Sequence, residues 1–495
     1  MIFSRGISPT FPILFTAMVA SLSVTAQEGY LQVSGRVYLD HNRNGFEDGF
    51  DFGYPAVAVR IYADINGNGV LDEQDPELGF AVSGAQGQFS HPDIPLLHTG
   101  YFATLDRADL PPKAIVNPGK IAFYPETSGC LEFGFQAEPA ICYAVGDGSS
   151  PDSLMIINTV SGRSVPFGGD LGTRYIEAMC LMPGGKDLFA IDRGRFGKIN
   201  LQTGRFVSYT DDIGTGNGQE GSIHFEDTDG LSYDPIRKKL FATAHRNKAP
   251  DLLYQIDTLT GKFVPDAFGK GRDYVTIRGE RNIADIGDIA VSPVSGRLYG
   301  VSHYGYRGGA NFLVIIDPNT GNTYIVDTLK YEGSRLDDVE GLGFNNEGEL
   351  YASTGSNAGE HSNTLFRINP ISAAATKVGQ FSHSSDFESC DCMVARPNEI
   401  RGRVFEDLND NRRWDPGERG LAGVTVYISP DRRQRDVEGQ LAATPEKVVT
   451  DREGRFSWRT FANRDFVLRL DEDRLSGTYT YTGGRLQGVS FLNSV

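Results

Sequence analysis

Three acidic loops of near-identical spacing, two near the start of the chain and one near its end, hold the residues best suited to chemistry. Each loop places oxygen-bearing side chains at positions 1, 3, 5, 9 and 12, the arrangement with which an EF-hand-type loop wraps Ca²⁺. Glycine at position 6 permits the sharp bend, and the carbonyl of position 7 is a further ligand. The predicted calcium ligands are Asp40, Asn42, Asn44, Phe46, Asp48 and Asp51 in loop 1, Asp64, Asn66, Asn68, Val70, Asp72 and Asp75 in loop 2, and Asp407, Asn409, Asn411, Arg413, Asp415 and Glu418 in loop 3.

The alternative for these loops is a set of acidic Asn-Gly turns that bind nothing. Ca²⁺ is a hard cation that tolerates irregular geometry, so short loops of carboxylates and amides suit it. Three copies in one register favour calcium over plain turns. Loop 3 has Arg412 where loops 1 and 2 have Gly45 and Gly69, which puts its affinity in question but not its identity.

The N-terminus predicts export. Arg5 precedes an apolar run over residues 11–22, and the small residues Val24 and Ala26 follow it, which is typical of a cleaved secretory signal over residues 1–26. The run is too short for a spanning helix, and no later segment holds about 18 consecutive apolar residues. We therefore expect a soluble mature protein outside the cell or on its surface, with no direct insertion into a membrane.

Composition narrows the possible partners. The chain has 495 residues and a net charge of −17, which argues against nucleic acid or an anionic membrane surface as a partner. A mature chain of this length is expected to divide into two to four domains. The five cysteines are few and odd in number, so they indicate neither a disulfide-dense scaffold nor a zinc pattern.

The fold class is predicted to be all-β, because short β-branched and aromatic runs alternate with Gly, Asn and Asp turns and helical periodicity is almost absent. The two ends of the chain look like copies of one module. Residues 34–40 and 401–407 each form a strand pattern that runs straight into a calcium loop. Further strand patterns follow at 55–62 and 421–428, and a turn entering another strand follows at 84–89 and 450–456.

This succession resembles the calcium-binding B-type module of serine–aspartate repeat surface proteins. The resemblance covers residues 34–138 and 399–495 and implies small immunoglobulin-like or transthyretin-like β-sandwiches that Ca²⁺ makes rigid. We assign the modules to 27–138 and 397–495, and the second lacks a counterpart of residues 130–135 and is expected to be incomplete. The first module departs from the pattern by carrying a second calcium loop.

The middle of the chain, residues 140–396, contains a repeat of about 50 residues, the period of propeller blades. One turn marks five copies, in which Asn or Asp ends a strand and Thr-Gly or a similar pair opens the next; the turns lie at 157–162, 199–204, 256–261, 316–321 and 368–373. The first repeat lacks an innermost strand and a spare one follows the last repeat, so we predict a five-bladed β-propeller closed by residues 388–392. A disulfide from Cys142 to Cys390 or Cys392 would lock that closure, and buried thiols are the alternative.

Aligning the repeats places an acid at the start of each innermost strand, at one mouth of the central channel. These acids are Glu177, Asp229, Asp288 (or Asp285), Glu340 and Glu388, with His245 and His303 at the ends of second strands nearby. Acids that converge on a narrow channel must be hydrated, protonated or bridged by a cation. The open alternatives are a metal-centred or sugar-binding site, with a histidine for proton transfer, and structural acids that bond backbone amides of the neighbouring blade.

Together these patterns predict an exported calcium-binding surface or matrix protein. Its role would be structural or adhesive, with Ca²⁺ as the cofactor and a protein or glycan bound at the propeller face. The alternative is a propeller hydrolase that acts on a glycan or lactone, with the sandwiches as accessory modules.

Overall fold

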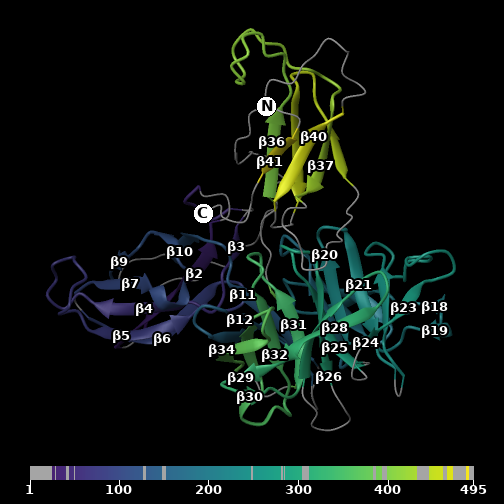
Figure 1. The fold of residues 1–495 in the computed structure, drawn as a ribbon. Helices are drawn as coiled ribbons and strands as arrows, with labels where there is room; N and C mark the ends of the chain where they lie inside the picture. The colour runs from purple at the N-terminus through teal and green to yellow at the C-terminus, as the bar shows by residue number, and fades with distance from the viewer. Residues whose placement is uncertain are drawn as a thin grey trace.

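A computed structural model describes residues 25–27, 29–40, 44–48, 51–97, 99–125, 130–147, 152–246, 249–279, 283, 285–303, 311–382, 386–392, 398–431, 445–460, 465–471 and 486–489. These residues are all-β apart from two single 3₁₀ turns, η1 (Arg107–Asp109) and η3 (Gly359–His361). Figure 1 shows purple and blue sheets on one side, teal and green sheets in the middle and a yellow-green group standing apart. In the ranges given, no helix is long and apolar enough to cross a membrane.

Two sheets form the N-terminal group, which we call sandwich 1. In the first sheet β2 pairs with β1, β3, β6 and β10, and β10 also pairs with β8; the second sheet has the order β5-β4-β7-β9. Alternation along β4 directs Val59 and Ile61 into a core that also holds Phe133 and Phe135 from the first sheet. The strands are β1 (Thr25–Gln27), β2 (Tyr30–Leu39), β3 (Phe52–Gly53), β4 (Ala58–Ala63), β5 (Glu77–Val82), β6 (Gln88–Pro95), β7 (Tyr101–Leu105), β8 (Ile115–Asn117), β9 (Ile121–Phe123) and β10 (Leu131–Gln136).

Five sheets, which we number I to V in chain order, make up the middle of the molecule; their strand pairs are antiparallel except for two parallel ones, made by the short outer strands β24 (Arg278–Gly279) and β29 (Lys330–Tyr331). Their strands run from the inner edge outward. Sheet I is β35 (Asp386–Cys392), β11 (Ile141–Asp147), β12 (Ser153–Asn158) and β13 (Ser164–Pro166), and sheet II is β14 (Ile176–Leu181), β15 (Leu188–Asp192), β16 (Arg195–Ile199) and β17 (Phe206–Thr210). Sheet III is β20 (Gly230–Asp234), β21 (Lys239–Ala244), β22 (Leu252–Ile256) and β23 (Tyr274–Thr276).

Sheets IV and V each gain short outer strands. Sheet IV is β25 (Asp285–Val291), β26 (Leu298–His303), β27 (Asn311–Ile316), β28 (Asn322–Thr328) and β24 (Arg278–Gly279). Sheet V is β31 (Val339–Phe344), β32 (Leu350–Thr354), β33 (Thr364–Ile368), β34 (Ala374–Gln380), β29 (Lys330–Tyr331) and β30 (Ser334–Arg335). A separate hairpin, β18 (Thr215–Gly218) and β19 (Gly221–His224), lies between sheets II and III in the sequence.

The five predicted turns are present, and each is held in the same way. The Asn or Asp carbonyl accepts a hydrogen bond from the amide four residues on, and its side-chain Oδ1 accepts one from the amide two residues on. The residue that closes the turn has positive φ, which favours glycine at four of the five positions. Ala373 adopts this conformation in the fifth turn, with φ of 53°.

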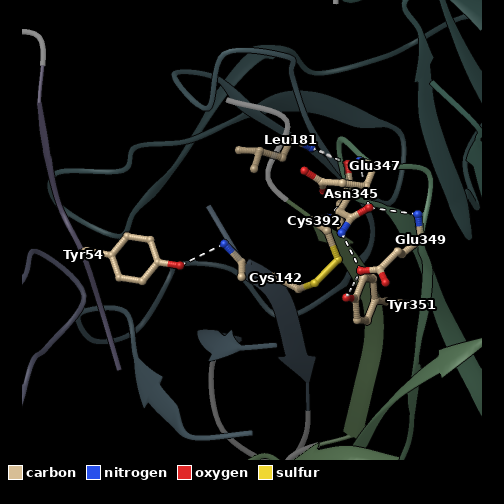
Figure 2. Close-up of a disulfide and its surroundings, with 10 residues drawn as sticks. Tyr54, Cys142, Leu181, Asn345, Glu347, Glu349, Tyr351 and Cys392 are labelled. Carbon is tan, nitrogen blue, oxygen red and sulfur yellow. Dashed lines mark hydrogen bonds between the residues drawn. A yellow bond between two sulfur atoms is a disulfide. The ribbon is translucent and has the colours of Figure 1, made fainter. Parts of the chain in front are cut away.

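The predicted closing strand is also present. β35, the last strand of the middle segment, pairs antiparallel with β11, the first, so that Cys142 lies opposite Cys392. These two cysteines form a disulfide, shown in Figure 2 beside Tyr351 and Glu349. Cys390 and Cys180 are buried free thiols, and Cys130 is an exposed one.

The inner strands contact one another in the cyclic order β35, β14, β20, β25, β31 and back to β35. Side chains rather than a shared sheet bridge several of these contacts. The Leu181 amide donates to Asp391 Oδ2 at 2.8 Å, and the Leu342 amide donates to Asp288 Oδ2 at 2.8 Å. Such bonds satisfy edge amides that have no ladder partner, as buried backbone groups require.

The C-terminal group, sandwich 2, repeats the opening pattern of sandwich 1. One sheet pairs β36 (Asn398–Arg403) with β39 (Arg455–Thr460), and the other has the order β38 (Glu446–Val449), β37 (Thr425–Pro430), β40 (Phe466–Leu470) and β41 (Leu486–Val489). Trp458 packs edge-on against Phe466 in the core of sandwich 2 and is 9% exposed. Lys238 of the middle segment pairs with Glu446 at 2.8 Å, and Ile236 packs against this core.

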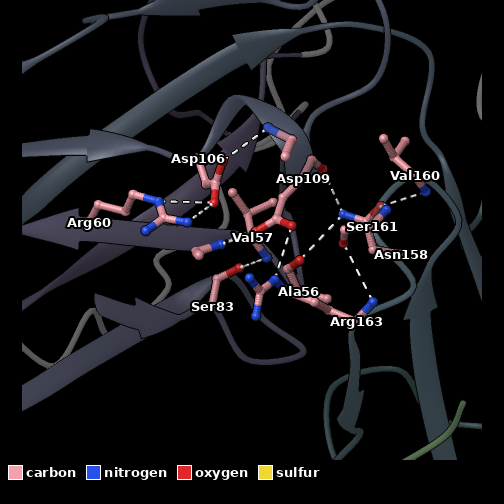
Figure 3. Close-up of polar contacts among 12 residues, drawn as sticks. Ala56, Val57, Arg60, Ser83, Asp106, Asp109, Asn158, Val160, Ser161 and Arg163 are labelled. Carbon is pink, nitrogen blue, oxygen red and sulfur yellow. Dashed lines mark hydrogen bonds and ion pairs between the residues drawn. The ribbon is translucent and has the colours of Figure 1, made fainter. Parts of the chain in front are cut away.

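Sandwich 1 is joined to sheet I by a network of polar contacts (Figure 3). Asn158 Nδ2 donates to the Asp109 carbonyl at 2.7 Å and to the Ala56 carbonyl at 3.3 Å. Arg163 Nε donates to the buried Asp109 carboxylate at 3.0 Å, whose other oxygen accepts from the Ala58 amide. A continuous apolar core crosses the same boundary, so the two parts form a fixed junction.

Candidate functional site

Within the described residues, the three acidic loops share a set of hydrogen bonds that recurs in each copy. The position 1 carboxylate accepts from the amides of positions 5 and 6, as Asp64 does from Asn68 at 3.1 Å and Gly69 at 3.0 Å. The matching bonds to Asp40 measure 3.1 and 3.0 Å, and those to Asp407 measure 3.2 and 2.9 Å.

The remaining ligand positions of each loop are linked to one another. In loop 2, Asn68 Nδ2 donates to Asp72 Oδ2 at 3.0 Å, and the Asp72 amide donates to Asp75 Oδ2 at 3.0 Å. The same two bonds recur in loop 1 from Asn44 to Asp48 and from Asp48 to Asp51, and in loop 3 from Asn411 to Asp415 and from Asp415 to Glu418. Asn42 lies outside the described residues. The structure thus brings together most of the predicted oxygen ligands of each loop.

Arg412 fits the glycine position of loop 3 by taking the glycine conformation. Its φ is 65°, against 84° at Gly45 and 72° at Gly69. A side chain in this left-handed region costs about 1–2 kcal/mol, because Cβ crowds the neighbouring carbonyl. Loop 3 therefore keeps the shape of the other loops at the expense of backbone strain.

We expect Arg412→Gly to raise the stability of sandwich 2 by about 1 kcal/mol and to strengthen calcium binding at loop 3, since the strain is removed. Gly69→Ala is the matched reverse change: nothing lies within 4 Å of its added Cβ, so it tests φ alone. Thermal unfolding and calcium titration of both variants measure these effects. If Arg412→Gly leaves the stability and the calcium affinity unchanged, Arg412 is not strained. If Gly69→Ala leaves them unchanged, position 6 does not require glycine.

Three of the predicted inner-strand acids lie at β-bulges. Register shifts place Glu177, Glu340 and Glu388 as the extra residues of β14, β31 and β35, while Asp229 directly precedes β20. Bulges redirect side chains and are frequent beside functional sites. We call the side of the inner strands that carries these residues the inner mouth.

The fourth sheet does not place the first of its two predicted residues, Asp288, at the mouth. Its bulged residue is Gly287, because Ile286 pairs with Ser302 and Asp288 with Val301. Asp288 lies one residue further on, is fully buried, and accepts from the Leu342 amide and from Ser389 Oγ at 3.2 Å. Asp288 is thus buried among the inner strands. The alternative residue, Asp285, lies at the mouth. A Cβ on Gly287 would approach His303 Nε2 to 2.9 Å, so the histidine ring takes the space of an acid there.

His245 gathers three carboxylates at the inner mouth. Its Nδ1 lies 3.5 Å from Asp229 Oδ2, 3.6 Å from Asp251 Oδ1 and 3.7 Å from Asp285 Oδ1. Burial and the carboxylates of Glu177 and Asp251 raise the pKa of Asp229 well above its usual value. Burial also raises the pKa of Asp251 to about 8, an effect that the Ile286 amide opposes and the Asp285 carboxylate increases.

His303 and Glu340 form a second pair at this mouth. His303 Nε2 lies 3.5 Å from Glu340 Oε2 and 3.0 Å from the Val339 carbonyl. Burial, the largest single effect, lowers the pKa of His303, but the Glu340 carboxylate, the Val339 carbonyl and the carboxylates of Asp285 and Asp338 together outweigh it, so the pKa is raised. Burial raises the pKa of Glu340 to about 7, with His303 opposing and Asp338 adding to the shift. Each side chain of this pair therefore favours the charged form of the other.

Sequence reasoning missed Asp251, which directly precedes the third strand of sheet III. A signal for it exists in the repeats. Asp152, Asp251 and Asn311 occupy the same position in sheets I, III and IV, and each side chain accepts from the first amides of the next inner strand, at Ile176, Ile286 and Val339. A polar residue at the start of each third strand would have indicated this shared structural role.

No family model matches the sequence. Over 192 residues, 37% of this chain, the sequence is 27% identical to serine-aspartate repeat-containing protein D of Staphylococcus aureus strain Newman, and the match to the protein of the same name from strain MW2 is equal. The chain spans about 13% of the length of these curated relatives.

Among solved structures, a chain of the nidogen/laminin complex aligns with a TM-score of 0.32 and 11% identity, over 51% of this chain and 97% of that one. A score this low carries no argument about fold or function. The chain is therefore similar, over about a third of its length, to serine-aspartate repeat-containing protein D.

Proposed function

We propose that this chain is an exported calcium-binding surface protein with a structural or adhesive role. Two B-type sandwiches flank a five-bladed β-propeller formed by sheets I to V, and the propeller presents the binding face to a protein or glycan. The similarity to serine-aspartate repeat-containing protein D supports a surface protein with B-type modules. The cyclic contacts of the inner strands and the β11–β35 pairing support the propeller.

One observation supports the calcium assignment: among the described residues, all three loops have the same hydrogen bonds joining positions 1, 5, 6, 9 and 12. A plain Asn-Gly turn needs only the bond from position 7 to the position 5 side chain. The additional bonds hold the position 9 and position 12 carboxylates beside the position 1 and position 5 oxygens. That is the oxygen-rich coordination that Ca²⁺ prefers.

Calcium at loop 1 would stiffen the junction between sandwich 1 and the middle segment. The Asp40 amide donates to the Phe135 carbonyl at 2.8 Å, and Gln136 Nε2 donates to Asp40 Oδ2 at 2.9 Å. Four residues further on, the Ala140 amide donates to Tyr54 Oη at 2.8 Å (Figure 2). The first calcium ligand is therefore bonded to the segment that leads into β11, and binding there restrains both modules together.

The test is calorimetric titration of Ca²⁺ into the metal-stripped mature chain, beside a variant carrying Asp64→Asn, Asp40→Asn and Asp407→Asn. Extracellular modules of this type bind with dissociation constants of about 10⁻⁴ to 10⁻³ M. We expect three sites in the unaltered chain and none in the triple variant. Absence of calcium binding in the unaltered chain, or its persistence in the folded triple variant, would overturn the assignment.

A further inference from the structure

A mixed nitrogen and oxygen cluster lies at the inner mouth, between sheets III and IV. Asp229 precedes β20, His245 follows β21, Asp251 precedes β22 and Asp285 begins β25. One ligand atom from each of the four side chains lies within 4.8 Å of the others. None of these residues belongs to the three acidic loops.

The imidazole is the observation that points to a ligand. His245 Nδ1 is a buried atom with no hydrogen-bond partner among the described residues, although three carboxylate oxygens face it. A buried nitrogen without a partner costs about 1–3 kcal/mol. A cation at the centre of the four groups would satisfy this nitrogen and the surrounding negative charge together.

The three distances from His245 Nδ1 match a small four-coordinate cation, and all four ligand atoms lie within 4.8 Å of one another. Metal–ligand bonds of about 2.1 Å in a tetrahedral site place neighbouring ligand atoms about 3.4 Å apart. The separations from His245 Nδ1 are 3.5, 3.6 and 3.7 Å. Imidazole nitrogen suits Zn²⁺ and similar transition metals, whereas Ca²⁺ takes six to eight oxygen ligands.

Asp251 and His245 differ in how firmly they are held. Asp251 is 1% exposed, with Oδ1 accepting from the Arg246 amide and Oδ2 from the Ile286 amide, both at close to ideal distance. These bonds fix the carboxylate in position before any ligand arrives. The His245 side chain is 32% exposed, which leaves a route for a metal ion to enter from solvent.

We propose that Asp229, His245, Asp251 and Asp285 form a binding site for a divalent transition metal of the zinc type, separate from the calcium loops. The site lies at the inner mouth, where it holds sheets III and IV together and offers an exposed metal face. It does not depend on the calcium function proposed above.

The experiment uses the tag-free, metal-stripped mature chain with Ca²⁺ present in excess, so that the acidic loops are filled. Zn²⁺ is titrated by calorimetry, and Co²⁺ is added separately as a spectroscopic probe of coordination geometry. We expect one Zn²⁺ site and the intense visible absorption of tetrahedral Co²⁺. His245→Gln should weaken Zn²⁺ binding more than about 100-fold, beyond the usual loss from an outer-shell change.

His224→Gln is the matched control, because His224 is an exposed histidine whose Nε2 lies 3.8 Å from one carboxylate, that of Asp212. It should leave both the Zn²⁺ affinity and the Co²⁺ spectrum unchanged. His245 is partly exposed, so its variant should fold, and far-ultraviolet circular dichroism checks this. The proposal is overturned if Zn²⁺ does not bind in excess Ca²⁺, if Co²⁺ gives only a weak octahedral spectrum, or if folded His245→Gln binds Zn²⁺ as the unaltered chain does.

Discussion

Chelating calcium is expected to lower the unfolding free energy of sandwich 1 by about 5 kcal/mol and that of sandwich 2 by about half as much. Each site filled at a hundredfold excess over its dissociation constant adds about 2.7 kcal/mol. Sandwich 1 carries loops 1 and 2, whereas sandwich 2 carries loop 3 alone. Calorimetric scans with and without chelator should therefore show two transitions that shift by unequal amounts.

Asp64→Asn isolates one loop in this experiment. Asp64 is buried and is the position 1 residue of loop 2. The variant should reduce the calcium-dependent shift of sandwich 1 by half, because loop 1 still binds. Asp93→Asn, on the exposed part of β6, is the control and should retain the full shift. If the unaltered chain unfolds at the same temperatures with chelator and with calcium, the prediction is wrong.

Replacing Cys142 and Cys392 together by serine is expected to lower the unfolding free energy of the middle segment by about 4 kcal/mol. The disulfide joins residues separated by 250 positions, and closing so long a loop removes much entropy from the unfolded chain. The β11–β35 ladder remains in the variant, so the fold should persist with lower stability. Denaturant unfolding of the double variant measures the loss.

Cys130→Ser controls for the loss of a thiol, because Cys130 is exposed and free. It should leave stability unchanged, and adding reductant to this control should reproduce the loss seen in the double serine variant. An unchanged midpoint in the double variant would mean that strand pairing alone closes the middle segment.

Local features of the molecule could be read from the sequence because their chemistry lies within a few residues. The acidic loops and the five turns are fixed by side chains that bond amides two to five positions away, as Asp64 and Asn158 do. The prediction that residues 388–392 complete the first sheet is confirmed by their pairing with β11. The first repeat lacks an innermost strand and one spare strand follows the last repeat, which leaves one way to complete that sheet.

The inner mouth required the tertiary structure. A bulge shifts by one position which side of a strand each residue faces, and this shift depends on strand pairing. The sequence therefore left Asp288 and Asp285 as alternatives, and the bulge at Gly287 places Asp285 at the mouth. His245 and Asp251 lie in the same β21–β22 connection, and packing of sheet IV against it brings Asp285 to within 3.7 Å of His245 Nδ1.

The sequence by itself thus determined the all-β class, the repeated turns, the positions of the acidic loops and the closing strand, since each rests on local spacing. Only the tertiary structure decided which acids are buried, which face one another and which histidine they surround, because those contacts depend on strand register and on packing between distant segments.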